Sequence, residues 1–206
     1  MSAIINDLLF LARSDSGKEK FELEPINLGD FIKDLAADVS VLTRKKHQKL
    51  ELKRIENPVV QGDEIRLRQL FLNILENAIR YTEPKGIITL SVTTEATMAK
   101  IRITDTGIGI TKADIEHIFE PFFRADQGRA RFEGGTGLGL AIGQKIAIAH
   151  GGKIEVESQE GKKGTSFSVF LPINPADQPA GQPRVARGVG KPGAISSRMH
   201  KLLFGR

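Results

Sequence analysis

Helical and strand-like periodicities follow one another in an irregular order along this chain, and that order leaves few folds open. Apolar residues recur every three or four positions over 1–14, 27–46, 63–81 and 137–150, which predicts four amphipathic helices. Segments with the two-residue period of strands lie at 87–94, 99–104, 153–158 and 165–171, with two short ones on either side of Pro58. Because there is no regular strand–helix–strand repeat, the sequence predicts an α+β protein, a two-layer α/β sandwich with helices on one face of a mixed sheet.

The positive net charge of the chain, +5 from 30 basic and 25 acidic residues, is concentrated in its last part. Six of the basic residues and one acidic residue lie beyond residue 173, which leaves 24 of each before it. The body is thus neutral, and we expect no direct contact with nucleic acid. The chain has no cysteine, which excludes disulfides and thiolate metal sites. No apolar run approaches the roughly 20 residues that cross a bilayer.

Composition divides the chain into four parts. Residues 1–16 carry a helix with a broad apolar face, which is too short to bury that face alone and is expected to pack on another helix or another chain. Residues 17–26 are predicted to form a linker and a first strand, and 27–173 the main globular domain. Residues 174–206 are rich in Pro, Gly and Ala and are predicted to be disordered, with a basic end that is solvated rather than bound to a membrane.

Two asparagines stand one helical turn apart on the predicted helix 63–81. Asn73 and Asn77 run along the edge of its apolar stripe and are followed by Arg80 and Tyr81. Asparagine is a mediocre helix former, because its amide competes for backbone hydrogen bonds. A single one is usually a surface residue without a task. Two amide oxygens at this spacing can instead ligate one hard cation together with phosphate oxygens.

A carboxylate and glycines follow the predicted strand 99–104, in the stretch DTGIGI. Asp105 at the strand end can accept a hydrogen bond from an exocyclic amine, and Gly107 and Gly109 allow the backbone to approach a flat ring. Asp-Thr-Gly is also the signature of aspartic proteases. That fold is all-β and pairs two such aspartates, so the helical content of this chain argues against it.

A second glycine-rich stretch, GGTGLGLAI, opens the last predicted helix. Gly135, Gly137 and Gly139 precede its apolar run, so free backbone N–H groups there can face an anion. The stretch is not a Walker A loop, and Ile142 stands where a full G-x-G-x-x-G motif needs its last glycine. Alone, this signal is weak.

Together, these segments resemble the catalytic ATP-binding domain of bacterial sensor histidine kinases, of the gyrase, Hsp90 and MutL type of ATPases. The N box, first glycine box, F box and second glycine box of that family are matched, in this order, by NILENAIRYT, DTGIGI, IFEPFFRAD and GGTGLGLAI. The similarity runs from about residue 21 to residue 172, and 1–16 resembles the end of the dimerisation and phosphoacceptor helix that precedes such a domain. The resemblance implies a Bergerat-type fold, with ATP held between the N-box helix and a lid.

The resemblance also implies roles for individual residues. Asn77 would ligate Mg²⁺, and Asn73 would position metal and phosphates, with Arg124 as a second catalytic residue on the lid. Asp105 would accept the adenine amino group. Arg80 stands where the family more often has lysine, which keeps the charge but changes its geometry. The remaining implied nucleotide-binding residues are Tyr81, Gly107, Gly109, Arg129, Arg131, Gly135, Thr136, Gly137, Leu138 and Gly139. The phenylalanines of the F box are expected to pack the base of the lid.

The implied activity is transfer of the γ-phosphoryl group of Mg–ATP to a histidine of a phosphoacceptor domain, upstream of a response regulator. Hydrolysing relatives carry a glutamate where this chain has Asn73. An amide cannot deprotonate water, so transfer is favoured over hydrolysis. The four histidines His47, His117, His150 and His200 all lie outside the H-[ED]-x-x-x-P setting of the acceptor.

We therefore expect a shortened kinase that is inactive without an added phosphoacceptor domain. The resemblance implies a cytoplasmic location, whether or not a longer parent chain is bound to the inner membrane. Two alternatives stay open at this point: a non-catalytic nucleotide-binding or dimerisation module, and an ATP-hydrolysing relative.

Overall fold

The computed structural model describes residues 2–125, 135–158 and 164–173, and every structural statement below concerns these ranges. Three predictions fall outside them. These are the disorder of residues 174–206 and the nucleotide contacts of Arg129 and Arg131.

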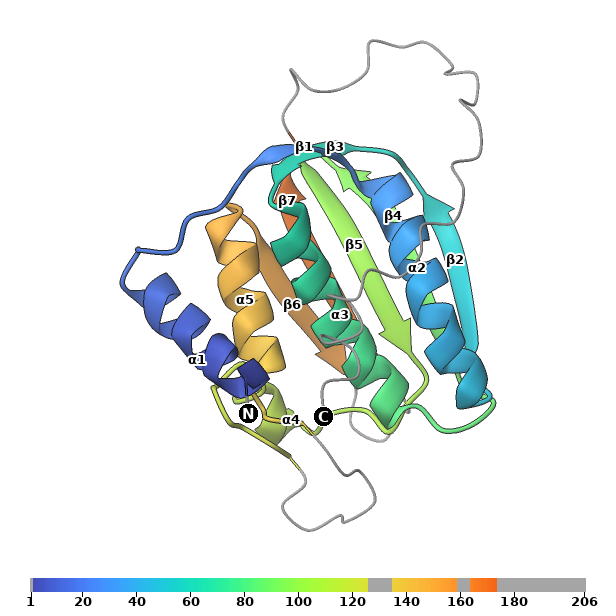
Figure 1. The fold of residues 1–206 in the computed structure, drawn as a ribbon. Coiled ribbons are helices and arrows are strands. Elements are labelled where there is room, and N and C mark those ends of the chain that lie inside the picture. Colours follow the sequence, from blue (N-terminus) through green and yellow to red (C-terminus); the bar gives the residue numbers. More distant parts are fainter. Residues whose placement is uncertain (1, 126–134, 159–163, 174–206) are drawn as a thin grey trace, which may run out of the picture.

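A five-stranded mixed sheet forms one layer of the molecule, in the order β2-β4-β5-β7-β6 (Figure 1). Its strands are β2 (Lys49–Ile55), β4 (Ile87–Glu95), β5 (Met98–Asp105), β6 (Lys153–Ser158) and β7 (Thr165–Pro172). β2 and β4 are parallel, and the other neighbours are antiparallel. A separate antiparallel pair is made by β1 (Glu24–Asn27) and β3 (Val59–Gly62). The predicted mixed sheet is confirmed.

Helices form the second layer. They are α1 (Ser2–Asp15), α2 (Leu28–Lys45), α3 (Glu64–Tyr81), α4 (Lys112–Ile115) and α5 (Gly139–Ala149). Figure 1 shows α2, α3 and α5 side by side over one face of the sheet, with α1 packed outside α5. This arrangement confirms the predicted α+β sandwich.

Local sequence explains where the long helices begin. The side chains of Asn27 and Asp63 accept hydrogen bonds from the backbone N–H groups of Asp30 and Arg66, so both residues are N-caps. The inner stripe of α3 is fully buried against the sheet. Its polar edge, which holds Asn73 and Asn77, is thereby fixed in direction.

The alternation of β5 places the carboxylate at its end. Ala99, Ile101 and Ile103 are buried on the face that the helices cover. Successive side chains of a strand point to opposite faces, so Asp105 follows them onto the same face. The strand therefore delivers Asp105 to the layer between sheet and helices.

His150, just after α5, joins three segments that are far apart in the sequence. Its Nδ1 donates to the carbonyl of Ile146 at 2.7 Å, and its Nε2 accepts from the backbone N–H of Asp63 at 2.9 Å. The ring of Phe21 stands edge-on to the imidazole at 5.4 Å. These contacts require the neutral imidazole with its proton on Nδ1, and they tie the linker and the start of α3 to α5.

Replacing His150 with leucine is expected to destabilise the domain. The substitution leaves the part-buried N–H of Asp63 without its acceptor, which costs about 1 to 2 kcal/mol of unfolding free energy. The exposed pair of His117 and Glu120 supplies the control, since His117→Gln is expected to change stability by less than about 0.5 kcal/mol. Urea unfolding of both variants measures the difference. Equal stabilities of His150→Leu and the unchanged chain would contradict this role.

Candidate functional site

The polar edge of α3 contacts the start of α5. The Asn73 side-chain N–H donates to the carbonyl of Gly139 at 2.8 Å. A side-chain carbon at Gly139 would lie 3.3 Å from the Asn73 amide carbon, so the small residue lets the two helices approach closely. The structure thus brings one predicted asparagine and one predicted glycine into direct contact, 66 residues apart in the sequence.

Arg80, nearer the end of α3, contacts the same glycine-rich segment at Gly135. Its guanidinium lies against Gly135, in the space that a side chain at Gly135 would need. Gly135 has a φ of +128° and Gly137 a φ of +72°, which favour glycine. A side chain at Gly137 would also collide with the backbone of Phe122 at 2.7 Å. The second glycine box is therefore packed between the α3 edge and the F box.

Asp105 is buried, with 6% of its surface exposed. Its Oδ1 accepts from the backbone N–H of Gly107 at 2.8 Å and of Thr165 at 3.3 Å. Burial raises the pKa of the Asp105 carboxyl above its ordinary value, and the two N–H donors partly oppose that rise. A carboxylate held in this way by one oxygen suits recognition of a hydrogen-bond donor.

The end of α3 sets the position of the loop after Asp105. The carbonyl of Tyr81 accepts from the N–H of Ile108 at 3.2 Å. A side-chain carbon at Gly107 would lie 2.5 Å from that carbonyl oxygen and 2.8 Å from Asp105 Oδ1. Glycine is required at position 107 because the Tyr81 carbonyl lies too close for a side chain. At position 109 it is favoured for another reason, a φ of +78°. The predicted Tyr81, Gly107 and Asp105 do come together.

Charged groups surround the α3 edge. Glu76, between the two asparagines, is half-buried, and burial raises the pKa of its carboxyl, with Arg80 opposing and Asp7 of α1 adding to the rise. Burial also lowers the pKa of Lys46, and the charge of Arg80 lowers it further. Arg80 therefore lies within electrostatic reach of both an acid and a second cation.

Other predicted residues take less direct positions. Thr136 Oγ1 accepts from the N–H of Leu138 at 3.3 Å, whereas the Leu138 side chain is fully buried in the core and only its backbone can face a ligand. Arg124 is exposed and has no ion pair with any residue in the described ranges. Phe119 and Phe123 pack against the core as expected. Phe122 does not: it is 59% exposed and has a φ of +68°.

The sequence reasoning missed several residues of this site. Thr165 donates to Asp105 from 60 positions away, Ser158 Oγ accepts from the N–H of Ile110, and Gln48 donates to the end of α3. Their contacts are made across the fold, so no local pattern marks them. Glu76 lies inside the stretch NILENAIRYT, but nothing in the sequence marks it as a site residue.

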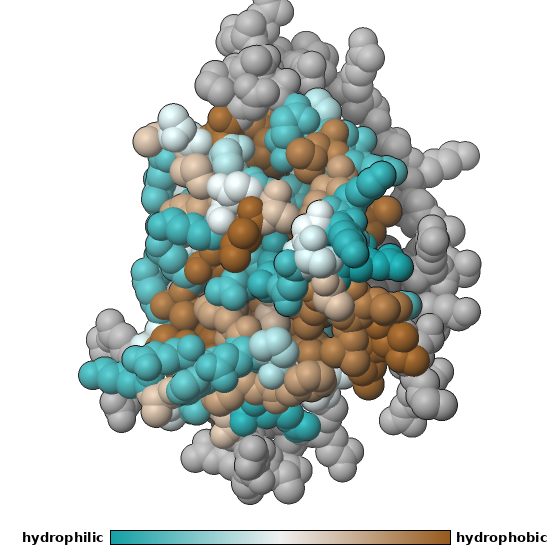
Figure 2. All heavy atoms as spheres, turned by 90° about the vertical axis from the view of Figure 1, so that its left-hand side faces the viewer, coloured by the Kyte–Doolittle hydropathy of each residue, from teal (hydrophilic) through white to brown (hydrophobic). Residues whose placement is uncertain are grey.

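The outer face of α1 exposes large apolar side chains. Ile4, Ile5, Leu8 and Leu9 are each at least 40% exposed, whereas Phe10 and Leu11 are buried against the domain. Figure 2 shows this side of the molecule, where apolar residues form a broad area in the lower half. The predicted packing of α1 on another helix is confirmed for its inner face, which contacts α5.

Two further structural results concern only the described ranges. None of the helices there is long and apolar enough to span a bilayer. Nor do three or more His, Cys, Asp or Glu side chains gather there in a way that could hold a metal ion.

Comparison with known proteins decides the family. Residues 62–175 match the model of the family described as "Histidine kinase-, DNA gyrase B-, and HSP90-like ATPase". The chain belongs to this family. Within it, the chain is 39% identical over 174 residues to the sensor histidine kinase RppB of Synechocystis sp., covering 84% of this chain and 38% of that protein. It is 38% identical to the sensor histidine kinase WalK of Bacillus subtilis, covering 84% of this chain and 28% of WalK.

Solved structures of the same ATPase family have the same fold. The catalytic domain of histidine kinase ThkA matches with a TM-score of 0.65 and 28% identity, over 77% of this chain and all of that domain. Full-length ShkA, solved in complex with AMPPNP, matches with a TM-score of 0.73 and 28% identity, over 83% of this chain and 35% of ShkA. The predicted resemblance to histidine kinase ATPase domains is confirmed. The chain spans well under half the length of RppB and WalK.

Proposed function

We propose that this ATPase domain binds Mg²⁺–ATP and donates the γ-phosphoryl group to a histidine of a phosphoacceptor domain, upstream of a response regulator. One observation carries the proposal. The polar edge of α3 touches both glycine segments, through Asn73 with Gly139, Arg80 with Gly135, and the Tyr81 carbonyl with Ile108.

The base end of the proposed site is built around Asp105. Its carboxylate is oriented by two backbone N–H groups, so little reorganisation is needed when it accepts the adenine amino group. Gly107 leaves no side chain between the carboxylate and the Tyr81 carbonyl. This geometry supports recognition of a flat ring that carries an exocyclic donor.

The phosphate end of the proposed site lies along Asn73, Asn77 and Arg80. The Asn73 amide N–H is bound to Gly139, which leaves its oxygen as the acceptor. Asn77 is half-buried, and its side chain has no hydrogen bond to any residue in the described ranges. These amide oxygens fit the hard ligands that Mg²⁺ prefers. Bound there, Mg²⁺ would neutralise phosphate charge, while Arg80 supplies a fixed cation.

The described histidines support an acceptor outside this domain. Both ring nitrogens of His150 are hydrogen-bonded and buried. His117 Nδ1 is paired with Glu120, and that bond raises the pKa of the imidazole, which favours its protonated and non-nucleophilic form. His47 is exposed at the turn after α2, but it is followed by Gln48 and not by the acidic residue of the acceptor motif. In the proposed reaction, the bond between the γ-phosphorus and the bridging oxygen breaks, a P–N bond to the acceptor imidazole forms, and ADP leaves.

The contact of Asn73 also supports transfer over hydrolysis. Its amide is not a base, and its N–H is committed to the Gly139 carbonyl. No proton of an attacking water can therefore be taken up at this position. We propose residues 27–173 as the catalytic unit, and the exposed apolar face of α1 as part of the surface that meets the phosphoacceptor domain.

Incubation with Mg–[γ-³²P]ATP tests the proposal. The chain alone is expected to remain unlabelled, and an added phosphoacceptor domain is expected to gain acid-labile, alkali-stable label. The same domain with its acceptor histidine changed to glutamine is the control. Strong self-labelling of the chain would contradict the proposal, and so would phosphate release as fast as transfer.

A further inference from the structure

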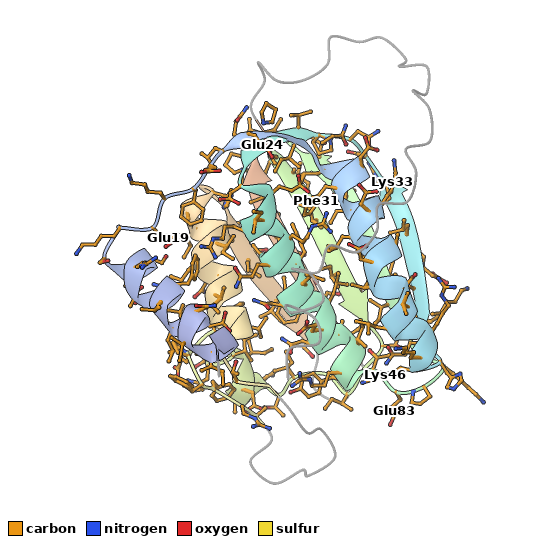
Figure 3. All side chains as sticks on the ribbon, viewed as in Figure 1. Glu19, Glu24, Phe31, Lys33, Lys46 and Glu83 are labelled. Atoms are coloured by element: carbon orange, nitrogen blue, oxygen red, sulfur yellow. The ribbon has the colours of Figure 1, made fainter. Side chains whose placement is uncertain are left out.

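Gln48 is a buried amide between α2 and β2, close to the end of α3. Only 6% of its surface is exposed, and its backbone N–H donates to the Thr43 carbonyl at 2.9 Å. Figure 3 labels its neighbour Lys46, where α2 ends beside the last turn of α3. A buried amide needs hydrogen bonds, so its partners show what holds it there.

Both partners of the Gln48 amide belong to the end of α3. Its Nε2 donates to the carbonyl of Ile79 at 2.9 Å and to the carbonyl of Thr82 at 2.6 Å. Its Oε1 has no hydrogen-bond partner among the described residues. The two N–H donors of the amide, rather than its oxygen, therefore make its contacts.

The two bonds do more than satisfy one carbonyl in the last turn of α3. The Ile79 carbonyl, in the last turn of α3, also accepts from Lys46 Nζ at 3.2 Å, so this carbonyl already has a cationic cap. Thr82 follows the last residue of α3 and has extended backbone angles. Thr82 is also the C-cap residue, so the bond to its carbonyl fixes the direction in which the chain leaves the helix.

The two residues between these bonds, Arg80 and Tyr81, both belong to the candidate site. Tyr81 lies between Ile79 and Thr82, and its carbonyl accepts from Ile108 and stands against Gly107. Gly107 in turn donates to Asp105 Oδ1. A short chain of contacts thus runs from the Gln48 amide through the Tyr81 carbonyl to the carboxylate.

We propose that Gln48 is a positioning residue for the purine: its two N–H donors clamp Ile79 and Thr82, and thereby set the distance between the Tyr81 carbonyl and the glycine loop that follows Asp105. The inference rests on the proposed function. In this role Gln48 makes no contact with the nucleotide itself and acts only through Tyr81 and Gly107.

The variant Gln48→Met keeps the length of the side chain and removes both donors. We expect its Kd for ADP, measured by calorimetry, to rise about fivefold or more. With an added phosphoacceptor domain, the KM for ATP is expected to rise by a larger factor than kcat falls, because Asn73 and Asn77 of the phosphate end lie earlier on α3 than the clamped carbonyls. The matched control is Thr43→Val, at a position that is also buried and whose hydroxyl bonds only within α2, to the Ser40 carbonyl. This control is expected to keep the Kd within twofold.

The possible outcomes distinguish a failure of the positioning role of Gln48 from a failure of the proposed function. If the unchanged chain binds no ADP, the proposed function fails first. If it binds ADP and folded Gln48→Met binds equally well, the positioning role is wrong even if the melting temperature falls. Should Gln48→Met not fold, the side-chain amide resonances of the unchanged chain decide. Those of Gln48 are expected to shift on ADP binding and those of Gln69, near the start of α3, to stay; an unmoved Gln48 signal would overturn the role.

Discussion

Asp105→Asn is expected to weaken ADP binding about 100-fold while leaving the fold intact. The amide oxygen of asparagine can still accept from Gly107 and Thr165, so the loop keeps its internal bonds. The other carboxylate oxygen is replaced by an N–H donor, which meets the adenine amino group as donor against donor. Losing a hydrogen bond to a charged acceptor and leaving two donors facing each other corresponds to about 100-fold in Kd.

The same substitution is expected to leave the free energy of unfolding equal or higher at pH 7. Burial raises the pKa of Asp105 in the folded state above the ordinary value of 3.8. A raised folded pKa means that protonation stabilises the fold. This contribution is fully present below the unfolded pKa and is lost as pH rises through the folded pKa. The advantage of asparagine over aspartate should therefore grow as the pH rises from the unfolded pKa through the raised folded pKa.

Calorimetry with ADP and urea unfolding at two pH values measure both effects. The control is Asp34→Asn, because Asp34 is an exposed residue in α2 without a hydrogen bond or ion pair to any described residue. This control should bind ADP normally. Unaltered ADP affinity in Asp105→Asn would show that the purine is read elsewhere, and loss of folding at neutral pH would show that the carboxylate is structural.

Asn77→Ala is expected to lower phosphotransfer to an added phosphoacceptor domain about 100-fold, with ADP affinity in the absence of metal retained. The Asn77 side chain has no hydrogen bond to the described residues, and alanine is the better helix former by about 0.5 kcal/mol. The fold should thus be unharmed or slightly stabilised. The loss would come from the amide oxygen that we assign to Mg²⁺ and phosphate.

Gln69→Ala gives a matched control for Asn77→Ala on the same helix. Gln69 is two turns nearer the start of α3 and bonds to Arg66. The Gln69→Ala variant should therefore transfer phosphate at the normal rate. If Asn77→Ala kept normal magnesium-dependent transfer, Asn77 would not be a ligand of Mg²⁺ or phosphate.

Much of this fold follows from short-range sequence signals. Asn27 and Asp63 cap the helices that their spacing predicts, and the alternation before Asp105 predicts the strand that delivers it. Such signals act within a few residues, so they survive in a single sequence. The predicted helix over 137–150 begins two residues later, at Gly139, because Gly137 is held against the backbone of Phe122.

Residues that act across the fold could not be predicted in this way. Gln48 reaches Ile79 across 31 positions and Thr82 across 34, and Thr165 reaches Asp105 across 60. Nothing near Gln48 in the sequence distinguishes it from other polar residues at a turn. Phe122 was expected to pack with its neighbours, but its left-handed backbone turns the side chain outward.

In the proposed function, the α3 edge and Asp105 together hold an adenine nucleotide. Calorimetric titration of the unchanged chain with ADP, and with ATP in the presence and absence of Mg²⁺, tests it most directly. We expect one saturable site for ADP and an ATP affinity that rises with Mg²⁺. Absence of saturable heat from protein that circular dichroism shows to be folded would contradict it.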